Sequence, residues 1–156
     1  MMPSMSPMEY PHIVIRGGKI RDCVNVVFRG FSAEEVEGLL RRLGWIDVLA
    51  GHDADLLGQP PVIQLQYPVV MEFLRYHIRL FRFRGEVVGN VHYNGVALQL
   101  QPPDLHKADH ERGAEFLRRQ LEGLCQVRVE KGGECDVLVV ERCLNTDAQM
   151  RAWLRP

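Results

Sequence analysis

Residues 73–94, FLRYHIRLFRFRGEVVGNVHYN, constrain the fold more than any other part of the chain. Apolar residues alternate with polar ones before and after Gly85, which is typical of two antiparallel strands joined by a short turn. Gly85 is the residue that can adopt a positive φ in that turn. The segment therefore predicts a β-hairpin.

The predicted register gathers polar side chains at one end of this hairpin. A two-residue loop at Arg84 and Gly85 would place Arg79 opposite Asn90, and it would pair His77 with His92. The other face is apolar enough to belong to the core, with Tyr76, Ile78, Leu80, Gly89, Val91 and Tyr93. Because arginine is a poor first residue for such a turn, a longer loop is the alternative, and a slip of one residue would exchange the faces.

The other periodic segments predict an α+β fold in a single domain. We expect strands at residues 12–15, 20–28, 62–67, 127–130 and 137–142, a short extended piece at 95–101, and helices at 32–44, 105–124 and 145–154. The expected sheet is mainly antiparallel or mixed, with about six to seven strands, two main helices and a short C-terminal helix. Residues 1–11 are expected to be a mobile tail, and residues 12–156 the domain.

Two local features refine this prediction. Ser32 and Glu35 have the spacing of a helix capping box, and Gly44 is suited to end that helix. Asn25 lies among apolar residues, so it would need hydrogen-bond partners if it were buried.

Composition excludes several classes of function. The formal net charge of −1 gives no electrostatic support for a nucleic-acid partner, and no apolar run is long enough to span a membrane. The first residues lack the charged leader and apolar segment of a signal peptide. We therefore expect a cytoplasmic protein whose four cysteines, which show no C-x-x-C spacing, are reduced thiols.

The start of the second main helix carries a further group of polar residues. His106, Asp109 and Arg112 are spaced by three and would share one helix face. If Asp109 is instead the N-cap, its carboxylate accepts hydrogen bonds from backbone N–H groups. His110 aligns with the apolar residues Ala114 and Leu117, so we expect it to be partly buried.

Three short motifs occur in order along residues 21–123. DCVNVVFRG at 22–30 precedes a helix that ends in LGW at 43–45, HIRLF follows at 77–81, and LHKADHER follows at 105–112. Together they resemble the LssY C-terminal domain family, in which an H-x-R-L-aromatic strand precedes a helix that opens with His and then Asp-x-Glu-Arg. The chain departs from the family pattern at Cys23, where a proline is usual. It also lacks the membrane-embedded regions, some of them phosphatase-like, that larger members carry.

The resemblance implies a domain that occurs alone or as an appendage, and it brings no settled activity. Its motifs match His77 and Arg79 in the strand, and His106, Asp109, Glu111 and Arg112 in the helix. Two arginine forks beside histidines suit an anion. We therefore predict a binding or accessory domain with no cofactor and a His/Arg/Asp site for a small anionic, phosphate-bearing ligand.

Two alternatives use the same residues. Imidazole and carboxylate groups could hold a divalent metal, which would make the protein a metal-dependent hydrolase of the phosphoesterase type. The ligands would be drawn from His77, His92, His106 and His110, with Asp109. In the other alternative the cluster is structural: Asp109 or Glu111 pairs with Arg79 or Arg112, and the domain binds another protein or a second copy of itself.

Overall fold

The computed structural model describes residues 9–15, 20–48, 54–70, 74–94 and 105–142, with only the backbone described at residues 20, 70, 74, 94 and 105–109. Strands β7 (Leu74–Phe83) and β8 (Glu86–Asn94) form the hairpin that the sequence predicts. Arg79 is opposite Asn90 and His77 is opposite His92, as expected. The loop has two residues, and Arg84 and Gly85 both have positive φ values, of 49° and 78°. The short turn is therefore formed although arginine is unusual there.

The hairpin lies inside a seven-stranded mixed sheet with the order β4-β6-β7-β8-β3-β10-β9. The other strands are β3 (Val26–Arg29), β4 (Ile46–Asp47), β6 (Ile63–Val70), β9 (Gln126–Glu130) and β10 (Val137–Glu141). All neighbours are antiparallel except β3 and β10, which are parallel. The predicted α+β fold with a mixed sheet is confirmed.

A second, three-stranded sheet has the order β2-β1-β5 and contains β1 (Ile13–Ile15), β2 (Ile20–Asp22) and β5 (Ala54–Leu56). The single strand predicted for residues 20–28 is therefore wrong. Residues 20–22 pair with β1 in the small sheet, and residues 26–29 pair with β8 and β10 in the large one. Residues 23–25 connect the two sheets, and alternation of apolar residues could not reveal that change of partner.

The two described helices cover one face of the large sheet. Helix α1 (Ala33–Arg42) begins with the predicted capping box, in which the Glu35 N–H donates to Ser32 Oγ over 3.1 Å and the Ser32 N–H donates to Glu35 Oε1 over 2.9 Å. Helix α2 (Leu105–Leu121) contacts β8. A Cβ atom on Gly113 would lie 2.5 Å from the Cα of His92, so the glycine permits this close approach.

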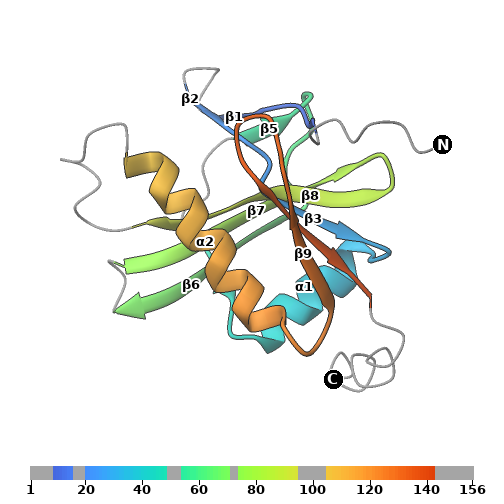
Figure 1. Ribbon diagram of the computed structural model, residues 1–156, viewed down its shortest axis with the longest axis vertical. Coiled ribbons are helices and arrows are strands. Elements are labelled where there is room, and N and C mark those ends of the chain that lie inside the picture. The colour runs from blue at the N-terminus through green and yellow to red at the C-terminus, as the bar shows by residue number, and fades with distance from the viewer. Residues whose placement is uncertain (1–8, 16–19, 49–53, 71–73, 95–104, 143–156) are drawn as a thin grey trace.

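Helix α2 lies across the large sheet on β8 (Figure 1). The large sheet has a hydrophobic core on each face. Alternate residues of β10 show the arrangement, since Leu138 and Val140 face the helices while Val137 and Val139 face the small sheet. The three layers are therefore helices, large sheet and small sheet, which buries both faces of the central strands.

Two local features depart from a simple pattern. Trp45 is buried, whereas the next residue, Ile46, is 47% exposed. Proline usually limits a central strand, yet β6 continues past Pro68 and pairs it with Arg75 of β7. On the other side of β6, the two residues of β4 pair only with Leu65 and Gln66, so the proline removes no ladder hydrogen bond to β4. The extended piece at 95–101, the C-terminal helix and most of the N-terminal tail lie outside the described residues.

Candidate functional site

Asn25 continues the sheet just before the first residue of strand β3. The last described pair of the β3–β8 ladder joins Val26 to Gly89. Beyond it, the buried side chain of Asn25 accepts from the Val91 N–H and donates to the Val91 carbonyl, both over 2.8 Å, and donates to the His110 carbonyl over 3.3 Å. The Asn25 side-chain amide therefore takes the place of a strand residue and joins α2 to the sheet. A buried asparagine was expected to need such hydrogen-bond partners.

Beside Asn25 lies a polar network of side chains from four elements. We define it as Asp22 of β2, His77 and Arg79 of β7, Asn90 and His92 of β8, and His110 of α2. All but the partly buried His92 are almost fully buried. Because burial of unpaired polar groups is costly, the mutual contacts of these side chains decide whether the network is tolerated.

Asp22 supplies negative charge to the network. Its carboxylate lies 3.6 Å from Arg79 Nη1 and 3.7 Å from His110 Nε2. The three side chains come from β2, β7 and α2, so they join both sheets and a helix. This arrangement compensates the buried guanidinium with a carboxylate of the same chain.

Asn90 determines which ring nitrogens carry protons. Its Nδ2 donates to the Cys23 carbonyl over 2.7 Å and lies 2.9 Å from His110 Nδ1, while its Oδ1 lies 2.9 Å from His92 Nδ1. A carbonyl can only accept, so the amide nitrogen must face Cys23. Nδ1 of His110 therefore accepts, and Nδ1 of His92 donates.

The network favours a neutral imidazole at His92. Burial lowers the pKa of His92 well below that of an exposed histidine, and the nearby His77 lowers it further; Asp22 opposes the shift, whereas His110 and Arg79 add to it. Both ring nitrogens of His110 also face groups inside the network. His110 is therefore poorly placed to exchange protons with a ligand.

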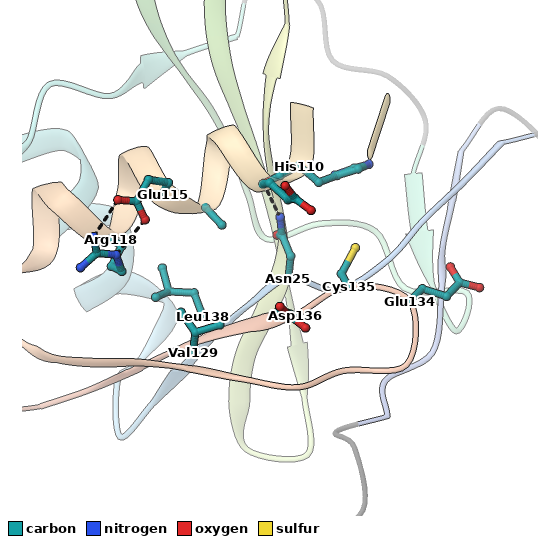
Figure 2. A pocket seen from close by; sticks show the side chains of 11 residues that line it. Asn25, His110, Glu115, Arg118, Val129, Glu134, Cys135, Asp136 and Leu138 are labelled. Atoms are coloured by element: carbon teal, nitrogen blue, oxygen red, sulfur yellow. Dashed lines mark hydrogen bonds and ion pairs between the residues drawn. The ribbon is translucent and has the colours of Figure 1, made fainter. Parts of the chain in front are cut away.

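A cavity of about 380 Å³ lies between α2 and the β9–β10 hairpin (Figure 2). His110 and Asn25 form part of its wall. The remaining lining combines apolar and charged residues: Glu111, Ala114, Glu115, Arg118, Val129, Glu134, Cys135, Asp136 and Leu138. Val129 is 58% exposed, so the cavity includes apolar surface open to solvent.

The charge of the cavity wall is mainly negative. Arg118, the one arginine among the described lining residues, donates to Glu115 through Nε over 2.8 Å and through Nη2 over 2.7 Å. These hydrogen bonds lower the pKa of Glu115 to about 2. Arg118 is thus already paired within its own helix, while Glu111, Glu134 and Asp136 add further carboxylates to the wall.

A disulfide between Cys23 and Cys135 ties the β9–β10 hairpin to the segment that follows β2, with 6.1 Å between the Cα atoms. The prediction that all cysteines are reduced thiols is therefore wrong for this pair. The fold brings together residues separated by 112 positions, and no local spacing signals such a pairing. Cys125 is buried, and Cys143 lies outside the described residues. A second cavity, of about 260 Å³, is lined by both bonded cysteines.

The residues predicted to form the site do not all lie in one described place. His77 and Arg79 belong to the buried polar network, while Glu111 is exposed and lines the cavity. Arg112 is exposed, and its guanidinium carbon lies 3.8 Å from the ring centroid of Tyr93. The side chains of His106 and Asp109 lie outside the described part of the chain.

Sequence reasoning missed Asp22 as a member of the site and underestimated His110. Asp22 is the last residue of β2 and opens the first of the three motifs, which is a weak signal for a buried carboxylate. His110 was expected to be partly buried, and its side chain is 5% exposed. Periodicity places His110 on the inner face of α2, but it cannot show that Asn90 lies opposite.

The fold and the site define an α+β domain with a buried histidine-rich polar network and an adjoining solvent-open cavity. Comparison of the chain with protein-family models, curated proteins and solved structures finds no match. None of the described helices is long and apolar enough to cross a membrane.

Proposed function

We propose that this protein is a non-catalytic binding domain whose small ligand occupies the cavity between α2 and the β9–β10 hairpin. The observation that carries the proposal is the cavity itself. Its volume of about 380 Å³ lies in the range of small-molecule sites. Apolar side chains beside a few charged ones also match the usual lining of such sites, in which apolar contacts give affinity and polar groups orient the ligand.

The lining suits a ligand with an apolar part and a neutral or cationic group. Val129 and Leu138 offer apolar surface, and Glu111 and Asp136 place carboxylates beside it. An anion in the cavity would face these carboxylates, while Arg118 is already bound to Glu115. Charge complementarity therefore disfavours an anion there.

The anionic ligand predicted at His77 and Arg79 remains a second prediction, located in the polar network. The carboxylate of Asp22 lies 3.6 Å from Arg79 and would compete with a phosphate for the guanidinium. A structural role of the network has more direct support, although from other residues than the predicted Asp109 or Glu111, because Asp22 and Asn90 connect His110 of α2 to the sheets. A structural role of the network is compatible with a domain that binds another protein or a second copy of itself.

The metal-dependent hydrolase has less support. In the part of the chain that the structure describes, no group of three or more His, Cys, Asp or Glu side chains could hold a metal ion. Elemental analysis of protein purified without added metal tests this alternative directly. Bound zinc, manganese or magnesium in stoichiometric amount would favour it over the binding domain.

Membership of the LssY C-terminal domain family also remains a proposal, supported by the three ordered motifs in residues 21–123. The same applies to the cytoplasmic location. The Cys23–Cys135 disulfide argues against a strongly reducing compartment, because structural disulfides are rare there.

Thermal-shift measurements with three sets of probes test the proposed function. The sets are amines such as tyramine and putrescine, neutral aromatic alcohols, and anions such as inorganic phosphate and phosphoserine. A ligand that binds only the folded state raises Tm. We expect a rise with an amine or a neutral probe, and none with phosphate at the same ionic strength.

A matched pair of variants locates the response. Val129→Arg places a long charged side chain in the cavity, and Val69→Arg makes the same change at an exposed position of β6 that is 49% exposed and does not line the cavity. The response should be lost in Val129→Arg and kept in Val69→Arg. No response to any probe, or a response that survives in Val129→Arg, overturns the cavity as the site. A phosphate response in both variants would favour the polar network.

A further inference from the structure

We propose that the contact between Asn90 and His110 acts as a pH-sensitive latch, which holds the first half of α2 against β8 when His110 is neutral and releases it when His110 is protonated. The effect on α2 stands independently of any ligand. The consequence that acid opens the wall of the cavity rests on the proposed function.

Hydrogen-bond directions carry this proposal. The amide nitrogen of Asn90 must face the Cys23 carbonyl, and its second hydrogen points to His110 Nδ1 over 2.9 Å. Protonation of Nδ1 would set two N–H groups against each other at that distance. Rotation of the amide by half a turn would remove this repulsion but create another, because Asn90 Oδ1 would then face the Cys23 carbonyl oxygen.

The charges around His110 act in both directions. The groups in the network and along the cavity wall are Asp22 of β2, His77 and Arg79 of β7, His92 of β8, Glu111, Glu115 and Arg118 of α2, and Glu134 and Asp136 of the hairpin. Asp22 favours an imidazolium, while Arg79 disfavours it. The exposed carboxylates of the wall are screened by solvent and weigh less than the buried groups.

His92 reinforces the preference for a neutral network. Its folded-state pKa lies well below the ordinary histidine pKa of about 6.5, so the unfolded chain takes up this proton first. The stability that His92 contributes is therefore complete above about pH 6.5, and it is lost as the pH falls from there toward the folded-state pKa. Acid thus weakens two neighbouring parts of the same network.

The release should be local, since α2 is held in different ways along its length. Among the described side chains of the first half, His110 is buried and polar: its ring contacts Asn90 and its carbonyl accepts from Asn25, while Gly113 packs against the backbone of β8. The second half is anchored by Leu117 and Leu121, which are fully buried in the core. Loss of the polar contacts can therefore open the start of the helix before the domain unfolds.

Amide hydrogen exchange measured without ligand tests the latch. After correction for intrinsic exchange rates, protection at residues 110–115 should fall roughly tenfold between about pH 7.5 and about pH 5.5, a change of about 1.4 kcal/mol. Protection in β7 and β8 away from the network should change less. His110→Gln should flatten the profile at residues 110–115, whereas the control His12→Gln, at a histidine whose side chain is 38% exposed, should leave it unchanged.

Nitrogen-15 spectra of the wild-type imidazoles supply a test that needs no variant. At about pH 7.5 His110 should carry its proton on Nε2 and His92 on Nδ1. The opposite tautomer at His110, an imidazolium there, or equal protection of α2 at both pH values overturns the latch. If α2 loses protection in acid but no probe binds, the latch is supported and the proposed binding function fails. If a probe binds while α2 stays protected in acid, the binding function is supported and the latch fails.

Discussion

At the scale of single residues, Asn25 shows how one side chain can replace a strand. It is 1% exposed and satisfies both backbone groups of Val91 as well as the His110 carbonyl. Backbone polar groups buried without partners are costly, so this residue should matter more than its small size suggests.

Asn25→Ala should lower the free energy of unfolding by about 3 kcal/mol, because it leaves both buried backbone groups of Val91 without these hydrogen bonds and removes a further one to the His110 carbonyl. Urea denaturation followed by circular dichroism measures the loss. Gln126→Ala, at an exposed position of β9, is the control and should change stability little. A loss equal to that of the control would show that water replaces the amide.

The protonation chemistry of His110 is also decided at this scale. Its pattern in the sequence is that of an ordinary core-facing helix residue, and its 5% exposure agrees with that. The orientation of Asn90 decides which nitrogen of His110 accepts, and therefore what a proton would do there. The chemistry of a buried histidine depends on its neighbours more than on its position in a helix.

At the scale of elements, the contact between α2 and β8 is unusually close. A Cβ atom on Gly113 would lie 2.5 Å from the His92 Cα and 2.7 Å from the Val91 carbonyl oxygen, and these are backbone atoms that cannot rotate away. The glycine therefore determines how near the helix approaches the polar network.

Gly113→Ala should destabilise the protein by about 2 kcal/mol, although the same change in an open helix would stabilise it. Thermal unfolding measures the effect, and exchange at residues 110–115 should rise with it. Gly133→Ala is the control, since a Cβ atom there meets nothing within 4 Å. An unchanged or higher Tm for Gly113→Ala would mean that the helix can shift without cost.

At the scale of the whole molecule, the Cys23–Cys135 disulfide joins the β9–β10 hairpin to the segment between the two sheets. It closes a loop with a sequence separation of 112 residues. A crosslink over such a long loop restricts the unfolded chain strongly. It also holds a wall shared by the two cavities, because Cys135 lines both.

Reduction should therefore lower the free energy of unfolding by about 4 kcal/mol. Urea unfolding with and without dithiothreitol measures the change, and peptide mapping without reductant should recover residues 23 and 135 as a crosslinked pair. A Cys23→Ala/Cys135→Ala double variant should unfold like the reduced protein and should not respond to reductant. Recovery of both cysteines as free thiols would contradict the disulfide and restore the original prediction.

Local patterns in the sequence were sufficient for several parts of this fold. Alternation around Gly85 gave the β7–β8 register, and the spacing of Ser32 and Glu35 gave the start of α1. Both features depend on neighbours within a few residues or across a two-residue turn. The faces of β7 and β8 that carry His77, Arg79, Asn90 and His92 could therefore be predicted as well.

Only the tertiary structure decided which residues those polar side chains contact. Asp22 reaches Arg79 because residues 20–22 leave for the small sheet, and His110 reaches Asn90 because β3 begins only at Val26. Periodicity determines which way a side chain faces along its own element, but it holds no information about which distant element lies opposite. The sequence by itself therefore determined the hairpin and its polar face, and long-range packing made that face a buried network beside a cavity.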